Sequence, residues 1–328
     1  MLESPPEKLR LSGFLTALLI GWIVLAAAGI LYARFKGIPG WAALPLLAAL
    51  LVEYPFYLVP AFPALRERFA GANLPAYLVV SAVLPYLVCC MGASRFEWGG
   101  LVRVAALALA MGLWYLVLPA IAALDLAFLA LIPAVLLGQY FQTIYLPLYP
   151  GLKNELAFLG HFTLIQMSII VLMLGRRVHE SGYGFVPTWR EWRIGALHYL
   201  YFVVVGLPLA LALNAVRWKT PAPIWSIAGT FLGFLWVVAL SEEFFFRGVL
   251  QQWIENWTWS RTIALLLTSV AYGMIHLGFG GQFPNWKWVA VATVLGWCCG
   301  HARNQAGGIR AGVVTHALAV ATWRGFFA

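Results

Sequence analysis

Residues 239–247 read Ala-Leu-Ser-Glu-Glu-Phe-Phe-Phe-Arg and stand at the end of an apolar run that begins near residue 224. The run is long enough to cross a bilayer, so Glu242, Glu243 and Arg247 are expected at membrane depth. An ionisable side chain there costs about 2.5 kcal/mol or more, which makes it a candidate for a functional site. The two adjacent glutamates are therefore the starting point for the function of this chain.

The composition indicates a polytopic membrane protein. The 328 residues are 62% hydrophobic and 10% charged, with a mean hydropathy of +0.85. Backbone groups in lipid are satisfied by helices or closed barrels, and the apolar runs lack the alternation of barrel strands. The sequence therefore predicts an all-α transmembrane bundle of roughly 10–11 membrane helices. The expected spans cover about 11–32, 41–62, 74–91, 104–123, 126–148, 156–174, 197–216, 224–240, 262–278, 288–300 and 312–327.

A polar and aromatic linker, residues 176–195, divides the chain. Thr188 and Glu191 have the spacing of a capping box, and two tryptophans and two arginines beside them suit a short helix at the headgroup level. We predict an accessory transmembrane region (1–178), an interfacial amphipathic linker (179–195) and a catalytic region (196–328), because all the charged intramembrane clusters follow the linker.

The glutamate pair can divide two tasks between its members. On a helix, Glu243 and Arg247 are separated by four residues and can form an ion pair. Glu242 points about 100° away and is free to act as a general base. The alternative is that these charges merely end the helix at the interface, with the arginine extended towards the headgroups.

Two later apolar segments carry His276 and His316. A single histidine in an apolar helix is more often a hydrogen-bonding group between helices, and this holds more strongly for His161. One carboxylate and two imidazoles converging from three helices can activate a water, stabilise an oxyanion and protonate a leaving amine, as peptide hydrolysis requires.

The ordered trio resembles the CPBP family of glutamic intramembrane proteases, which includes the type II CAAX prenyl proteases. It consists of Glu242-Glu243-x-x-x-Arg247, then Tyr272-x-x-x-His276, then a glycine-rich approach, 307–312, to His316. The resemblance covers about 192–327. It implies that Glu242 activates water, that Glu243 supports it with Arg247, that His276 shares the water, and that His316 helps to form the oxyanion hole.

Two positions depart from the family pattern. Tyr272 stands where the second motif usually has Phe, which keeps the aromatic ring. Val320 stands where the last motif often has Asn four residues after the histidine, so one oxyanion donor is expected to be missing. Asn304, Thr315 or a backbone amide are the candidates to replace it.

A metal is not expected. Two histidines and a glutamate could hold zinc, but the spacing is not His-Glu-x-x-His, and an arginine beside the glutamates opposes a cation. We predict no cofactor and no metal. The cysteines form two adjacent pairs in apolar runs, 89–90 and 298–299, and are read as buried thiols. Glu53 is read as a structural or accessory carboxyl within its span, and Asp125 as a loop charge between spans and a helix N-terminal residue.

The preferred function is an intramembrane endopeptidase acting on a membrane-embedded or lipid-anchored protein. A proton-coupled transporter is the alternative, since buried Glu, His and Arg also form proton relays, although transporters usually carry such groups in both halves. A noncatalytic scaffold with the same fold is a third possibility. The expected partners are membrane lipids and a membrane-bound peptide, with no nucleic acid, because the basic residues are scattered among loops. The expected location is a bacterial inner membrane.

Overall fold

The computed structural model describes residues 7–145, 152–178 and 181–328. These residues form helices and turns without a strand, apart from one isolated bridge between Trp218 and Phe327. The all-α prediction is confirmed. The chain divides into two compact units, Met1–Arg177 and Val178–Ala328.

Each expected span overlaps a helix, and among the described residues seven helices are long and apolar enough to cross a membrane. The seven are Leu11–Phe35, Gly40–Ala61, Gly71–Gly92, Trp98–Val117, Glu155–Gly175, Trp189–Ala212 and Ile224–Thr258. Two shorter apolar helices are Ala122–Leu137 and Arg261–Met274. The last residues of the expected span 126–148, and two residues of the linker, lie outside the described residues. The chain is an integral membrane protein.

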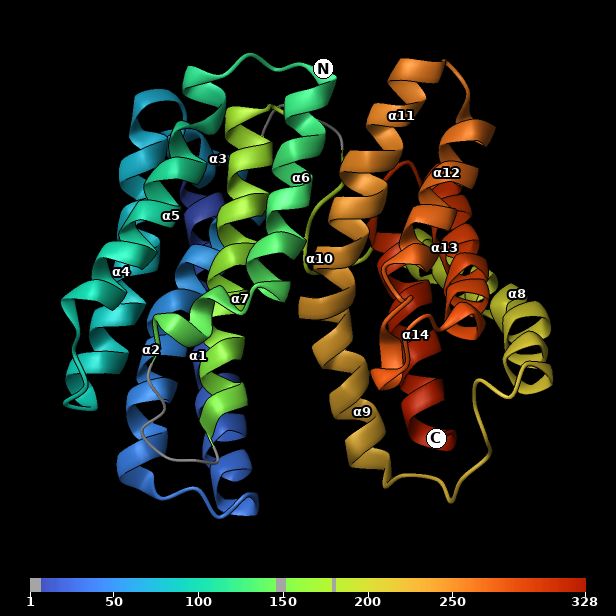
Figure 1. Ribbon diagram of the computed structural model, residues 1–328, viewed down its shortest axis with the longest axis horizontal. Coiled ribbons are helices and arrows are strands. Elements are labelled where there is room, and N and C mark those ends of the chain that lie inside the picture. The colour runs from blue at the N-terminus through green and yellow to red at the C-terminus, as the bar shows by residue number, and fades with distance from the viewer. Residues whose placement is uncertain (1–6, 146–151, 179–180) are drawn as a thin grey trace. The chain divides into compact units, whose positions relative to one another are not determined.

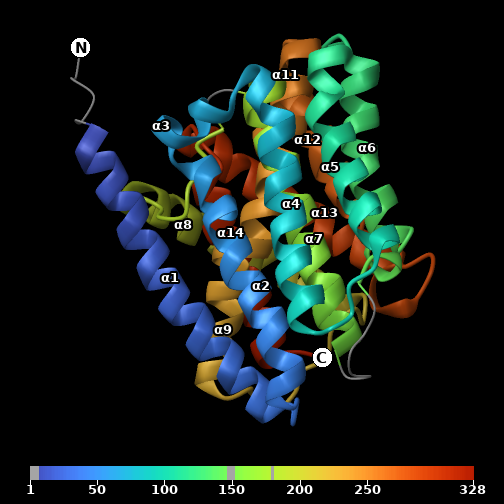
Figure 2. The same ribbon diagram turned by 90° about the vertical axis from the view of Figure 1, so that its left-hand side faces the viewer.

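The first unit is a bundle of long helices. Helix α2 packs on both α1 and α4, and α4 packs on α5 (Figure 2). The helices are α1 (Glu7–Phe35), α2 (Gly40–Leu58), α3 (Pro63–Arg66), α4 (Leu74–Gly92), α5 (Trp98–Val117), α6 (Ala122–Leu137) and α7 (Lys153–Ile170), which continues as a π-helical turn, Val171–Gly175.

Two carboxyl groups of the first unit are buried. Glu53 on α2 is fully buried within the first unit. Asp125 lies in the first turn of α6, as expected of a residue at a helix N-terminus, but it is buried and does not lie in the loop. Its carboxylate accepts two hydrogen bonds from Arg176, at 2.8 and 2.9 Å, which compensates its charge.

The second unit contains the sequence motifs. Its helices are α8 (Trp189–Ala212), α9 (Ile224–Gly233), α10 (Ala239–Glu243), α11 (Gln251–Thr258), α12 (Arg261–Met274), α13 (Trp286–Ala306) and α14 (Arg310–Phe326). Helix α14 packs against α8, α9, α10 and α13, and α13 packs against α8 and α12 (Figure 1). Residues from α10, α12 and α14 can therefore meet inside one bundle.

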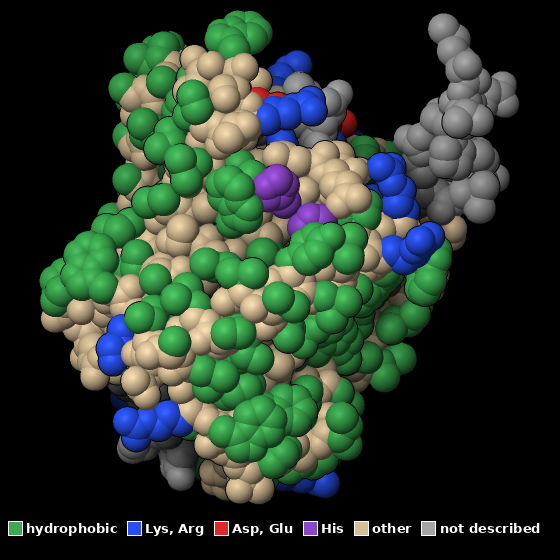
Figure 3. Space-filling view, turned by 90° about the vertical axis from the view of Figure 1, so that its right-hand side faces the viewer, with side chains coloured by type: hydrophobic (Ala, Val, Ile, Leu, Met, Phe, Trp, Pro, Cys, Tyr) green, Lys and Arg blue, Asp and Glu red, His purple; other side chains and the backbone are tan. Residues whose placement is uncertain are grey.

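Helix α8 begins where the sequence predicts, with Thr188 and Glu191 forming both hydrogen bonds of a capping box. The prediction of a separate short interfacial helix is wrong, because α8 continues without a break to Ala212. The face seen in Figure 3 is covered mainly by hydrophobic side chains, with Lys and Arg near its edges. Exposed Leu200, Val204 and Val205 of α8 are of the kind that contacts lipid.

Candidate active site

The glutamate pair lies within one long helical rod that runs from α9 through α11 (Figure 1). Helix α10 contributes only five residues to this rod, between π-helical turns at Phe234–Val238 and Phe244–Leu250. Turns of this kind often mark functional positions in helices. The Glu243 side chain is fully buried, whereas that of Glu242 is 31% exposed. The two carboxyl groups therefore occupy different environments.

Glu243 belongs to an enclosed ion pair. Its Oε1 atom lies 3.2 Å from Nη1 of Arg247, and neither side chain is exposed. Nη2 of this arginine donates a hydrogen bond to the Gly296 carbonyl at 3.1 Å. The guanidinium carbon lies 4.5 Å from the ring centre of Tyr272, a cation–π contact. Arg247 is thus held by three elements and compensates the charge of the inner glutamate.

His316 on α14 lies between the two carboxylates. Its Nδ1 atom is 3.0 Å from Glu243 Oε1, and its Nε2 atom is 3.8 Å from Glu242 Oε2. An ionised carboxylate only accepts hydrogen bonds, so Nδ1 carries a hydrogen and Nε2 of the neutral ring is an acceptor. Glu243 therefore fixes both the orientation and the tautomer of this imidazole.

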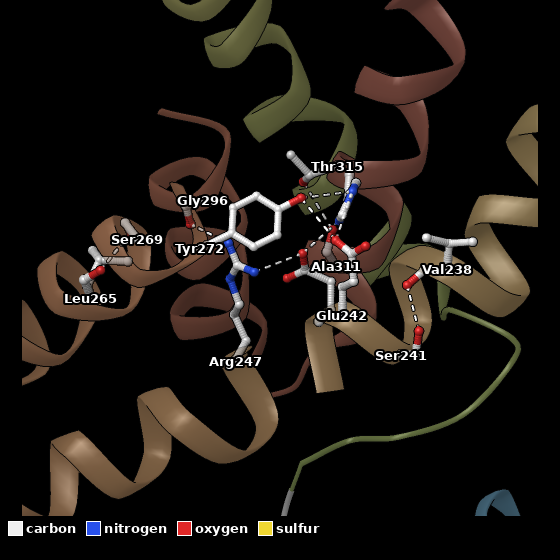
Figure 4. A network of polar contacts seen from close by, with 12 residues as sticks. Val238, Ser241, Glu242, Arg247, Leu265, Ser269, Tyr272, Gly296, Ala311 and Thr315 are labelled. Carbon is white, nitrogen blue, oxygen red and sulfur yellow. Dashed lines mark hydrogen bonds and ion pairs between the residues drawn. The ribbon is translucent and has the colours of Figure 1, made fainter. Parts of the chain in front are cut away.

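Tyr272 on α12 completes the cluster. Its hydroxyl lies 3.1 Å from Glu242 Oε2 and 3.2 Å from His316 Nε2 (Figure 4). A phenol has one hydrogen, and both neighbours can accept it. The hydroxyl hydrogen is therefore shared between the outer glutamate and the imidazole.

His276 follows the end of α12. Its Nδ1 atom lies 3.0 Å from the Tyr272 carbonyl oxygen, which is only an acceptor. Nδ1 therefore carries the hydrogen, and Nε2 of the neutral ring remains available to accept a proton or to bind a water.

These groups line a cavity of about 220 Å³. Its polar end contains Glu242, Tyr272, His276 and His316. The remaining walls are largely apolar and come mainly from α8, α13 and α14, with Val320 one helical turn after His316. Neither Glu243 nor Arg247 lines the cavity, so the compensated pair lies behind the surface that a bound molecule would touch.

Comparison with known proteins gives one match. Residues 223–322 match the family model described as Rce1-like, type II CAAX prenyl endopeptidase Rce1-like. The matched segment makes up less than a third of the chain. The matched segment contains all five residues singled out from the sequence, together with Tyr272 and Val320. No curated protein and no solved structure matches the chain.

The two positions that depart from the motif pattern, Tyr272 and Val320, both lie within the matched segment. The side chain at position 320 is a valine that faces the cavity and offers no hydrogen-bond donor. Two of the expected replacements lie elsewhere. Thr315 is buried and donates towards the Gly195 and Ala311 carbonyls. Asn304 accepts hydrogen bonds from Gln251 and Arg303 near the end of α13.

The hydroxyl of Tyr272 is the feature that sequence reasoning missed. The motif comparison treated Tyr as equivalent to Phe, because both supply an aromatic ring. A buried tyrosine usually finds a hydrogen-bond partner, so a Tyr in place of Phe was itself the available signal.

The sequence predicts no metal site, and the structure groups one set of possible ligands among the described residues. Atoms of Glu243, Cys299 and His316 lie within 4.8 Å of one another, and all three residues are buried. Arg247 already occupies Oε1 of this glutamate, and the hydrogen on His316 Nδ1 points at the same oxygen. A cation in this position would have to displace a guanidinium, which makes the donor set a poor fit for a resident metal.

Proposed function

We propose that this chain is an intramembrane endopeptidase that hydrolyses a peptide bond of a membrane-embedded or membrane-anchored protein. The observation that carries the proposal is that the two glutamate side chains lie in different environments. Arg247 compensates the inner carboxylate, while the outer one, Glu242, faces a cavity beside two imidazoles. This division gives one positioned base and one structural anion.

In the proposed reaction, Glu242 and His276 hold a water molecule in the cavity. Glu242 takes a proton from the water while the water oxygen attacks the peptide carbonyl carbon, and the carbonyl π electrons move onto oxygen. The resulting oxyanion is stabilised by hydrogen-bond donors of the site. Collapse of the intermediate breaks the C–N bond, and the proton on Glu242 passes to the leaving amine.

The cavity also favours a class of substrate. Apart from its polar end, its walls are mainly apolar side chains, including Phe202, Leu207 and Trp288. Arg324 is the one Lys or Arg residue among the described residues that line it. Such a cavity suits an apolar peptide segment or an attached lipid chain, with an anionic group accommodated near the arginine.

The proposal is tested with purified protein in liposomes and a library of membrane-anchored peptides. Cleavage is followed by mass spectrometry, and the same vesicles report proton flux through an enclosed pH-sensitive dye. We expect peptide cleavage that is lost in Glu242→Gln, and no flux that depends on this residue. Absence of cleavage together with a proton flux that Glu242→Gln abolishes would favour the transporter alternative.

A further inference from the structure

Tyr272 occupies the place in the site where an additional donor is needed. Its hydroxyl lies 3.1 Å from the carboxylate of Glu242 and 3.2 Å from His316 Nε2, and the residue lines the cavity. At position 320, one turn beyond His316, the cavity wall carries a valine. The site thus has a hydroxyl on α12 and lacks a side-chain donor at this position of α14.

We propose that Tyr272 is a catalytic residue whose hydroxyl donates a hydrogen bond to the oxyanion of the tetrahedral intermediate. This inference rests on the proposed function. The phenol O–H stays intact throughout, since the oxyanion accepts its hydrogen bond without taking the proton. The Tyr272 hydroxyl on α12 therefore provides the hydrogen-bond donor that Val320 on α14 does not provide.

The resting contacts explain how the hydroxyl becomes free at the correct moment. Before attack, Glu242 is an anion and a strong acceptor for the Tyr272 hydrogen. When Glu242 takes the proton of the attacking water, it becomes a neutral acid and a weaker acceptor. The developing oxyanion is then the strongest acceptor near the phenol, so the hydrogen bond shifts to it as negative charge forms there.

The ring of Tyr272 is held firmly enough for this role. Its residue is 1% exposed, Arg247 lies against the ring, and Phe246 contacts it edge-on with 5.2 Å between ring centres. A donor that is fixed before the reaction needs little reorganisation when charge develops, and this is the main requirement for oxyanion stabilisation.

Tyr272→Phe removes only the hydroxyl oxygen and keeps the ring contacts. The matched control is Tyr77→Phe, because the Tyr77 hydroxyl also belongs to a buried tyrosine but donates to the Phe56 carbonyl at 3.1 Å, away from the cavity. We expect Tyr272→Phe to lower kcat by roughly 10²- to 10³-fold with little change in KM, and Tyr77→Phe to stay near the wild-type value.

The deciding experiment adds the missing donor. In the double variant Tyr272→Phe with Val320→Asn, kcat is expected to recover at least about tenfold over Tyr272→Phe alone, because an amide at 320 can replace the lost donor. If Tyr272 only positioned Glu242, the amide added at position 320 would not restore kcat. A folded double variant without recovery, or an unchanged kcat in Tyr272→Phe, overturns the proposal.

The outcomes also separate this inference from the proposed function. Cleavage by the wild type that is lost in Glu242→Gln but kept in Tyr272→Phe removes the role of the tyrosine and leaves the protease intact. Absence of cleavage in both the wild type and Val320→Asn removes both proposals. Thermal unfolding of each variant in detergent establishes that the proteins compared are folded.

Discussion

His316 donates a hydrogen bond from Nδ1 to Glu243 Oε1 across 3.0 Å, and it does so behind the cavity wall. The inner carboxylate thus orients an imidazole whose other nitrogen faces the outer carboxylate. The two neighbouring glutamates therefore have different contacts, and we expect different effects from disturbing each of them.

Replacing Glu242 with Gln should remove the general base without disturbing the fold. The amide keeps the shape of the side chain, which is already partly exposed to the cavity. Turnover in liposomes is expected to fall roughly 10²- to 10⁴-fold, with the unfolding temperature nearly unchanged. The matched control is Glu97→Gln, which removes the same charge from an exposed residue before α5. Near-wild-type turnover in Glu242→Gln would show that another group is the base.

Replacing Arg247 with Met should destabilise the protein, because it leaves Glu243 buried without its cation. Loss of one partner from a buried ion pair costs about 3–5 kcal/mol. The double variant Glu243→Gln with Arg247→Met removes both charges and should regain most of that stability while remaining poorly active. Thermal unfolding with a parallel cleavage assay separates these effects.

A surface pair provides the control for that measurement. Arg261 lies 2.9 Å from Glu255, but its side chain is 79% exposed. Arg261→Met is expected to cost at most about 1 kcal/mol, since solvent screens such pairs. Equal losses in the buried and exposed variants would contradict the assignment of Arg247 as the compensating charge.

Strong chelators should leave cleavage intact, because the proposed reaction uses a carboxylate-activated water. Cys299→Ser sharpens this test, since Cys299 is one of the three grouped residues that could hold a metal. We expect Cys299→Ser to stay active, and we expect the same of the neighbouring variant Cys298→Ser. A metal site would instead be established if phenanthroline abolished the activity of the wild type, zinc restored that activity, and Cys299→Ser were inactive.

Gly312→Ala should impair the site from the side of α14. A Cβ atom at this position would lie 2.9 Å from Glu243 Oε2 and 3.1 Å from the Cys299 carbonyl, so the carboxylate must shift. Overpacking of this kind costs about 1–3 kcal/mol, and the displaced carboxylate would no longer orient His316. Turnover and the unfolding temperature should both fall.

The control for this variant is Gly229→Ala on α9, where a Cβ atom would meet no other atom within 4 Å. Alanine is a better helix former than glycine by about 0.5–1 kcal/mol, so this variant should be as stable as the wild type or slightly more so. A Gly312→Ala protein with wild-type turnover would mean that the position of Glu243 matters less than its contacts suggest.

The helices of this protein were predictable from the sequence, because long apolar runs can only be helical in lipid. The grouping of Glu242, Glu243, His276 and His316 is expected from motif order. The structure places Glu242, His276 and His316 on one cavity wall, with Glu243 behind it in contact with His316. Their roles in catalysis remain predictions. The division of the chain into accessory, linker and catalytic regions likewise remains a prediction.

Other features depend on contacts that no local pattern encodes. The pairing of Asp125 with Arg176 joins residues 51 positions apart, and packing alone decides it. The hydroxyl of Tyr272 acquires its partners from α10 and α14, whereas its own segment specifies only a ring. The π-helical turns on either side of α10 are not indicated by the sequence pattern.

Because of those two π-helical turns, the number of residues in the rod determines where the charged side chains of the site lie. Deleting one residue between Glu243 and Arg247 would bring them three positions apart and rotate the guanidinium by about 100° relative to the inner carboxylate. The shortened segment could still form a good helix, and every charged side chain would still be present. Over this stretch the spacing of the residues is therefore a constraint on the site that is separate from their identity.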